Sequence, residues 1–405
     1  MDRPEQTLSA VLDAGELLLT SGAEAARVED TMRRLARAYG FVRADVLTIT
    51  ASMAVTVRTA DDQVITQTRR ILRRGTDMRC IEAVNELSRE VCVNPVPPEE
   101  LHARLEAIRT APDKLRCRLP LAYLITSGSF AVFFGGTWRD GAAAMLCSVL
   151  LYVIGVLGDR ISLQPLVLTM VSSAAMCAAA TLTVKTGMGQ NLDYIIIGNI
   201  MLLIPGIPFV NSMRDIFVGD TITGLLSAFE AVFESACHRG RLRARAHADW
   251  GRCRMTGEIL LQIVMAMIGA LGFGLLFHIS GSRLITIMLG AAVNWGVYLL
   301  AMQWYDNRVT AFFVSTLATA ALAEVLARLL KAPVITLLVP MLVPLIPGGD
   351  LYYTTLALVQ GDTAGFARYG TLFIEEAGAM AFGVILVACL VQTLGKLWLL
   401  HSARK

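Results

Sequence analysis

Apolar runs of about 20 residues fill the chain from Pro120 onward, and they constrain its fold more than any other feature. A helix needs about 20 mostly apolar residues to cross a hydrocarbon core of about 30 Å. Because lipid offers no water to backbone polar groups, only helices or closed barrels cross it. The sequence therefore predicts a polytopic α-helical membrane protein with about nine or ten spans. The candidate spans are 119–137, 141–157, 165–184, 192–210, 258–279, 284–303, 309–329, 334–350 and 378–400.

Composition separates a polar N-terminal region from this apolar remainder. The whole chain is 55% hydrophobic and has a mean hydropathy of +0.57, whereas its first 118 residues are rich in Arg, Asp and Glu. About 115 residues are enough to bury a small core. We expect a cytosolic α+β domain over 1–116, a first membrane half over 117–257 and a second over 258–405.

A broken apolar stretch occurs twice, at a fixed offset of 142 residues. Ile204-Pro205-Gly206 returns as Ile346-Pro347-Gly348, and Gly219-Asp220-Thr221 returns as Gly361-Asp362-Thr363. Glu234 likewise returns as Glu376. Seven identities without a gap indicate a duplicated membrane half, since solenoid repeats are far shorter.

Local patterns outline the N-terminal domain. Ser21 followed by Glu24 predicts a capping box at the start of the second helix. Arginines between Arg69 and Arg79 form a basic edge, which is either solvated or able to touch anionic headgroups. The expected helices are 5–21, 23–39, 77–92 and 98–110, and the expected strands are 45–58 and 64–71.

Three charged residues of the second expected helix form an N-terminal motif: Glu24, Arg27 and Glu29. They either face a ligand or partner, or form ion pairs along a solvated helix. In the first case this domain could be the working module, binding or hydrolysing a metabolite, with the membrane part as its anchor. His102 and Ser21 are the only side chains there that suggest catalysis.

The placement of Lys and Arg predicts the orientation. Six arginines lie in 239–254, between the two halves, and an even number of preceding spans puts this segment and the N-terminal domain in the cytoplasm. The start of the chain lacks the apolar core of a signal peptide. We expect a multi-pass protein of the inner (plasma) membrane, with 211–238 as a cytoplasmic or interfacial helix.

Several classes of function find no support in the sequence. The chain has no GxGxxG, Walker A, GxSxG or HExxH motif, so we expect no enzyme and no bound cofactor. Its eight cysteines form no CxxC pair, and Cys237-His238 with His247 and Cys253 fits no standard zinc spacing. A net charge of +3 gives no reason to expect nucleic acid.

Polar residues around the two breaks are the candidate substrate site. Proline removes a helical hydrogen bond and glycine loosens the backbone, so freed N–H and C=O groups can bind a polar solute between two repeats. A desolvated carboxylate there could exchange protons. The candidates are Pro205, Gly206, Asn211, Arg214, Asp215 and Asp220 in the first half, and Pro347, Gly348, Asp350, Tyr352, Asp362 and Glu376 in the second.

Together these motifs resemble the threonine/serine exporter (ThrE) family. Gly22-Ala-Glu24 with Arg27-Val-Glu29 resembles its N-terminal signature. Leu202-Leu-Ile-Pro-Gly206 and Pro344-Leu-Ile-Pro-Gly-Gly349 resemble its two membrane halves, fused here in one chain. The resemblance implies export of small hydroxy amino acids, driven by the proton motive force.

The expected function is therefore a secondary, proton-coupled antiporter of threonine or serine. Split relatives imply export of small dicarboxylates such as succinate as an alternative, and a metabolite sensor or a passive channel are further ones. Expected partners are the small-molecule substrate, protons and the lipid bilayer, and a homo-oligomer stays open.

One stretch departs from the family pattern. The family's first half usually ends in a fifth apolar span, whereas Glu234-Ser-Ala-Cys-His-Arg-Gly-Arg-Leu-Arg-Ala-Arg245 is too polar to cross a membrane. If the missing span normally inverts the second half, the two halves of this chain are parallel repeats.

Overall fold

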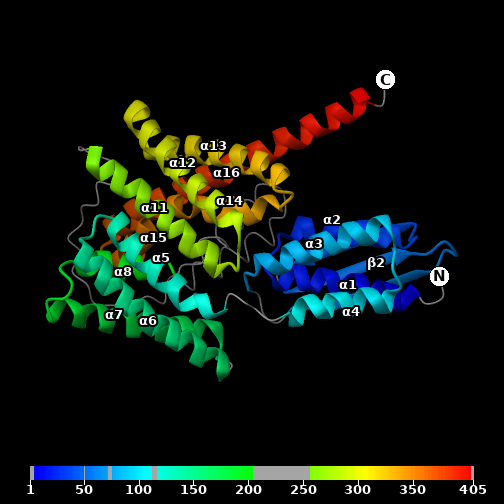
Figure 1. The fold of residues 1–405 in the computed structure, drawn as a ribbon, viewed down its shortest axis with the longest axis horizontal. Helices are drawn as coiled ribbons and strands as arrows, with labels where there is room; N and C mark the ends of the chain where they lie inside the picture. The colour runs from blue at the N-terminus through cyan, green and yellow to red at the C-terminus, as the bar shows by residue number, and fades with distance from the viewer. Residues whose placement is uncertain are drawn as a thin grey trace. The chain divides into compact units, whose positions relative to one another are not determined.

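The computed structural model describes residues 4–49, 51–71, 75–111, 116–161, 163–203 and 256–402 (Figure 1). The chain divides into two compact units. Unit 1 is Met1–Arg116 with Phe277–Ile279, and unit 2 is Cys117–Leu276 with Ser280–Lys405. The first is an α+β unit with one small sheet, and the described part of the second is helical.

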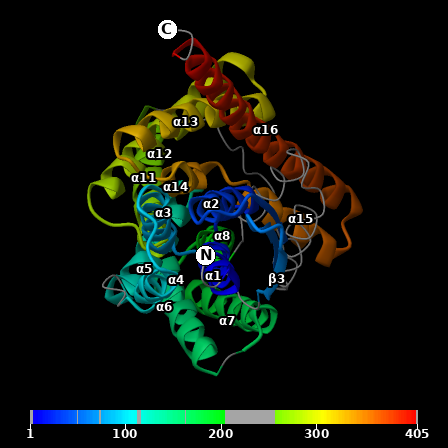
Figure 2. The ribbon, with the colours of Figure 1, turned by 90° about the vertical axis from the view of Figure 1, so that its right-hand side faces the viewer.

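Unit 1 packs four helices on one face of an antiparallel sheet with strand order β1-β2-β3. Helices α1 and α2 lie between the sheet and the helices α3 and α4 (Figure 2). In β2 the residues Met53, Val55 and Val57 are buried against the helices, while their neighbours are more exposed, as the two-residue period of a strand requires. The elements are α1 (Pro4–Thr20), α2 (Ala25–Ala38), β1 (Arg43–Ile49), β2 (Ser52–Arg58), β3 (Val64–Arg70), α3 (Met78–Val93) and α4 (Pro98–Thr110).

Two sequence predictions in unit 1 are wrong. The expected strand over 45–58 is a hairpin, because the chain reverses between Ile49 and Ser52, which pair with each other. No Gly or Asn marks that reversal, so the alternating pattern reads as one strand. The expected capping box is absent: Glu24 itself is the residue before α2, and its side chain makes no capping hydrogen bond.

Unit 2 contains six described helices that are long and apolar enough to cross a membrane, or seven if one bent pair counts as a span. The chain is therefore a multi-pass membrane protein. The helices are α5 (Leu119–Phe133), α6 (Trp138–Arg160), α7 (Pro165–Lys185), α8 (Leu192–Ile200), α11 (Thr256–Leu276), α12 (Ser282–Tyr305), α13 (Arg308–Leu329), α14 (Val334–Leu342), α15 (Gly348–Gln360) and α16 (Thr363–Ser402), with the short 3₁₀ helices η1 (Arg116–Arg118) and η2 (Val343–Leu345).

Two of the expected spans have different bounds. The run 119–137 forms a helix of only 15 residues, since Gly135 takes a positive φ of 103° and Gly136 donates to the carbonyl of Ala131, a glycine-terminated helix end. The run 378–400 belongs to the much longer α16, which starts at Thr363. The expected span 192–210 begins as α8 and continues outside the described residues.

Helix spacing in unit 2 follows the sequence repeat. Helices that begin at Trp138, Pro165 and Leu192 have counterparts that begin at Ser282, Arg308 and Val334, which are 142 to 144 residues later. The first helices of the two halves, α5 and α11, pack against each other. A Cβ atom at Gly269 of α11 would lie 2.6 Å from the ring of Phe130 in α5, so glycine permits this close approach.

Candidate functional site

The predicted interruption in the second half is confirmed by the path of the chain. Helix α14, the 3₁₀ turn η2 and helix α15 follow one another with a bend of 54°. Pro344 lies in η2 and Pro347 immediately precedes α15, and neither can donate a backbone hydrogen bond. Gly348 opens α15 and donates instead to the carbonyl of Ile346 at 2.6 Å.

Asn294 of α12 supports the backbone at this break. Its side-chain amide donates to the carbonyl of Met341 in α14 at 2.9 Å. Its side-chain oxygen accepts from the hydroxyls of Ser315 (2.6 Å) and Thr319 (3.0 Å) in α13. All of these side chains are fully buried, so the cluster satisfies polar groups that would otherwise be costly.

Arg308 of α13 joins the two predicted carboxylates of the second half. Its Nη2 atom lies 2.8 Å from Oδ2 of Asp350, in the first turn of α15, and 2.8 Å from Oε1 of Glu376 in α16. Glu376 is fully buried and Asp350 nearly so. Neither carboxylate oxygen of Glu376 has a well-formed hydrogen bond among the described residues, although its carboxyl group lies within reach of that of Asp350. One half-buried cation thus faces two buried acidic groups.

Sequence reasoning missed Arg308, although a signal for it exists. A positive charge at the first position of a helix is unfavourable next to the positive end of the helix dipole. Arg308 occupies that position, directly after Asn307, whose side chain caps α13 by accepting from Thr310. An arginine placed there at the start of an apolar run indicates acidic partners elsewhere in the chain.

Tyr298 contacts this ion-pair cluster, and two further tyrosines follow Asp350 in α15. The Arg308 side chain also reaches the hydroxyl of Tyr298, whose ring stacks on Trp295 with centroids 4.5 Å apart. Tyr352 lies beside Asp193 of α8, yet its buried hydroxyl makes no well-formed hydrogen bond among the described residues. Tyr353 is next in α15, with its ring centroid 5.2 Å from that of Tyr352. The site therefore combines charged groups with the aromatic surface of Tyr298.

Asp362 lies apart from the cluster. It follows Gly361, which ends α15 with a φ of 73°, and it accepts from the N–H of Gly365 at the start of α16. Twelve residues separate it from Asp350 along α15, which amounts to roughly 18 Å. The structure thus gives Gly361-Asp362-Thr363 the role of a turn with a helix cap.

The predicted site residues of the first half lie outside the described residues. These are Pro205, Gly206, Asn211, Arg214, Asp215 and Asp220, and Glu234 and the arginine segment 239–254 lie there too. The question of parallel or inverted repeats, which depends on 234–245, falls in the same stretch.

Two of the described polar residues of the first half, Asp140 and Asn199, are built into the fold. Asp140 caps α6 and accepts from Thr137, and its other oxygen accepts from the backbone N–H groups of Gln190 (2.6 Å) and Asn191 (2.8 Å). Asn199 donates to the carbonyl of Ala144 at 3.2 Å. Asp140 therefore holds the α7–α8 connection in place and has no free oxygen for a solute.

The N-terminal motif contributes mainly to the structure of unit 1. Glu29 accepts from Arg33 at 2.6 Å and from the backbone N–H of Thr48 in β1 at 3.0 Å, which ties α2 to the sheet. Glu24 is the residue before α2, and Arg27 lies in its first turn. This arrangement favours the interpretation of Glu29 as one member of an ion pair on a helix.

No group of three or more His, Cys, Asp or Glu side chains within the described ranges could hold a metal ion. The Cys237, His238, His247 and Cys253 combination lies outside those ranges.

Comparison with known proteins identifies the family. The model described as "Putative threonine/serine exporter" matches residues 9–237, and "Threonine/Serine exporter, ThrE" matches 262–390. A protein of Mycobacterium tuberculosis named "Probable threonine/serine exporter" is 22% identical over 94% of this chain and 75% of its own length. The "Threonine/serine exporter" of Corynebacterium glutamicum is 21% identical over 92% of this chain and 80% of its own length.

A shorter relative matches only part of the chain. "Probable succinate transporter subunit YjjP" of Escherichia coli is 26% identical over 53% of this chain and 83% of its own length. No solved structure matches the chain. Since the two family models together cover both membrane halves and most of unit 1, the chain belongs to the threonine/serine exporter (ThrE) family.

Proposed function

We propose that this protein exports threonine and serine across the inner (plasma) membrane in exchange for protons. The names of the two full-length relatives support the substrate class. The membrane-length helices support a path across the bilayer. In this proposal unit 1 lies in the cytoplasm, as the basic segment 239–254 favours.

The observation that carries the proposal is the pair of carboxylates on Arg308. Asp350 and Glu376 contact the same guanidinium nitrogen, so their contacting oxygens are no further apart than twice 2.8 Å. With both carboxylates ionised the cluster has a net charge of −1, and with one proton it is neutral. Because an unbalanced charge is costly away from water, this cluster is suited to hold and release one proton.

The same cluster offers complementary groups for an amino acid. The α-carboxylate of the substrate would bind Arg308 and the first turn of α15, where helical N–H groups are free of intrahelical partners. The α-ammonium would bind Oε2 of Glu376, which lacks a donor among the described residues. Binding of the ammonium would favour loss of the shared proton, which couples the two fluxes.

The direct test is efflux from proteoliposomes that contain the purified full chain. Vesicles loaded with labelled L-threonine are diluted into buffers that set a pH gradient of either sign or none. We expect saturable efflux that is faster when the outside is more acidic than the inside. An uncoupler should slow this efflux to the rate measured without a pH gradient. Efflux no faster than that from loaded vesicles without protein rejects transport. Saturable efflux that does not respond to the pH gradient rejects proton coupling but not transport.

A second substrate class has its own support. The YjjP relatives match 53% and 51% of this chain and carry the name of a succinate transporter subunit. Labelled succinate is therefore measured in the same vesicles. If the vesicles release succinate but not threonine, the substrate is a dicarboxylate and not an amino acid. If both solutes leave rapidly and their efflux does not saturate, the protein is a channel.

The orientation has a separate test. Val93 at the end of α3 is 77% exposed, so a V93C variant presents a thiol at the surface of unit 1. With the eight native cysteines replaced by serine, a membrane-impermeant maleimide should label V93C in whole cells only after permeabilisation. Equal labelling of intact cells places unit 1 outside.

A further inference from the structure

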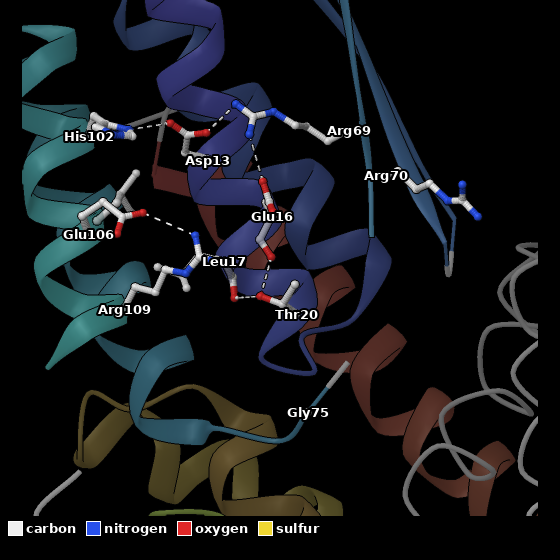
Figure 3. A pocket seen from close by; sticks show the side chains of 11 residues that line it. Asp13, Glu16, Leu17, Thr20, Arg69, Arg70, Gly75, His102, Glu106 and Arg109 are labelled. Carbon is white, nitrogen blue, oxygen red and sulfur yellow. Dashed lines mark hydrogen bonds and ion pairs between the residues drawn. The ribbon is translucent and has the colours of Figure 1, made fainter. Parts of the chain in front are cut away.

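Unit 1 contains a cleft of about 700 Å³ between α1, β3 and α4 (Figure 3). Each helix lines it with one stripe of its surface, at positions i, i+3, i+4 and i+7. Facing stripes of this spacing are normally apolar and fill the space between two helices. Here only Leu17 and Leu105 are apolar. The stripes are Asp13, Glu16, Leu17 and Thr20 of α1, and His102, Leu105, Glu106 and Arg109 of α4.

Ion pairs hold the walls of the cleft together. Asp13 of α1 lies between Arg69 of β3, at 2.6 Å, and Nδ1 of His102 in α4, at 2.8 Å. Arg69 also contacts one oxygen of Glu16 at 3.1 Å. A chain of charged groups thus crosses all three elements and fixes their side chains, as a preformed binding site requires. Ser21, the hydroxyl that the sequence suggested for catalysis, is buried and does not line this cleft.

The charges that line the cleft are mixed and balanced in number. Asp13, Glu16 and Glu106 stand against Arg69, Arg70 and Arg109, and His102 adds a charge only when protonated. Figure 3 shows the Arg70 side chain pointing away from the others. This balance favours a ligand that carries one positive and one negative group over a dication or a dianion, because like charges in a confined site repel.

Two groups in the cleft remain available for a ligand. Arg69 uses only one carboxylate oxygen of Glu16. Arg109 is 63% exposed and makes a long contact of 3.4 Å with Glu106. A carboxylate on the α1 wall and a guanidinium on the α4 wall are the two partners that the ammonium and carboxylate of one small molecule need.

We propose that this cleft binds a small zwitterionic α-amino acid, with its ammonium on Glu16 and its carboxylate on Arg109. The site is separate from the Arg308 cluster of unit 2, and it would let unit 1 respond to amino-acid concentration. The choice of L-threonine as the probe follows from the proposed transport function, whereas the site itself rests on the cleft alone.

Amide hydrogen exchange of the full chain in lipid nanodiscs tests the site, because it reports ligand binding separately for the peptides that line the cleft. L-threonine is titrated up to tens of millimolar, with putrescine and succinate as a dication and a dianion at equal ionic strength. We expect saturable slowing of exchange in peptides from α1 and α4 with L-threonine only. No change in these peptides with L-threonine, or equal protection by any of the other solutes, overturns the proposal.

Variants on the two walls provide a second measurement. Glu16→Gln and Arg109→Gln should each weaken the threonine-dependent protection by at least about tenfold, the loss of one charge-assisted hydrogen bond. Glu99→Gln, an exposed acid in the first turn of the same helix α4, should leave it unchanged. If threonine slows exchange in α1 and α4 but the protein does not transport threonine, the cleft is still a binding site. If the protein transports threonine but exchange does not change, only the proposal of a binding site in the cleft is rejected.

Discussion

Asp350 and Glu376 contact the same nitrogen of Arg308, each at 2.8 Å, although they belong to different helices. Replacing Glu376 with Gln keeps the shape of the cluster and leaves one cation paired with one carboxylate. Such a neutral pair needs no proton. We therefore expect Glu376→Gln to fold well, to bind threonine more weakly and to lose the dependence of efflux on the pH gradient.

Counterflow measures this change without a net proton flux. Exchange of internal for external threonine by Glu376→Gln should persist. Efflux driven by the pH gradient should fall at least about tenfold, which corresponds to a loss of roughly 1.4 kcal/mol in the coupling between proton and substrate. The comparison variant is Glu375→Gln, the adjacent and exposed acid on α16. Gradient-driven efflux by Glu376→Gln at the wild-type rate contradicts a proton on this cluster.

Removal of the cation should harm the fold itself. Arg308→Met leaves two carboxylates buried with no positive partner, and breaking a buried ion pair in this way costs about 3–5 kcal/mol. The expected result is a clearly lower melting temperature in detergent and a lower yield of monodisperse protein.

A matched control for this experiment lies on the same helix. Arg328 of α13 is 66% exposed and lies 3.6 Å from Glu324, so Arg328→Met should change stability by less than about 1 kcal/mol. If Arg308→Met melts at the same temperature as Arg328→Met, the carboxylates are not held by Arg308.

The site shows which features can be predicted from sequence. Pro347 and Gly348 act on the backbone where they stand, so the interruption of the second half follows directly from the residue types. Asp350 and Glu376 stand out because charge is rare within apolar runs. Arg308 was missed because its role depends on partners brought to it by two other helices, and no local pattern contains that information.

The same distinction applies in unit 1. Periodicity predicts its four helices and the presence of a sheet, because burial of one face repeats along each element. The reversal between Ile49 and Ser52 has no glycine or asparagine to mark it, and the strand was predicted too long. The cleft was not predicted, since Asp13 and His102 meet only after α1 and α4 pack together.

The break between α14 and α15 should depend on Asn294. Asn294→Ala removes the donor to the Met341 carbonyl and the acceptor for Ser315 and Thr319, all in a buried site. Each buried polar group left without a partner costs about 1–3 kcal/mol. We expect a lower melting temperature and slower threonine efflux, with Thr286→Ala, a half-buried position on the same helix whose hydroxyl bonds only within its own turn, as a near-neutral control. Equal melting of both variants contradicts a supporting role for Asn294.

The contact between the two halves should depend on Gly272. A Cβ atom there would lie 3.0 Å from the backbone nitrogen of Thr126 in α5, and that backbone cannot move without shifting the helix. Gly272→Ala should destabilise the protein by about 1–3 kcal/mol, as overpacking does. Gly257→Ala on the same α11 meets nothing within 4 Å and should be neutral or slightly stabilising, since Ala favours a helix. The melting temperatures of the two variants are compared. A melting temperature of Gly272→Ala equal to that of Gly257→Ala contradicts close packing of α5 on α11.

Tyr39 predicts how unit 1 responds to alkaline pH. Burial raises the pKa of Tyr39 to about 12, from an ordinary 10.0, and its buried hydroxyl has no hydrogen-bond partner in the part of the chain that the structure describes. The folded state therefore prefers the neutral phenol. This contribution is complete below pH 10 and is lost as the pH rises from 10 to about 12.

Tyr39→Phe removes both the unpaired hydroxyl and the ionisation, so at neutral pH it should be neutral or stabilising by up to about 1 kcal/mol. Hydrogen exchange of peptides from α2 at pH values from 8 to about 11 measures the effect, after correction for the intrinsic rate. The variant should show less loss of protection at high pH than the wild type, and Tyr305→Phe, an exposed tyrosine of α12, should behave as the wild type. Identical pH profiles for Tyr39→Phe and the wild type contradict a buried neutral phenol at this position.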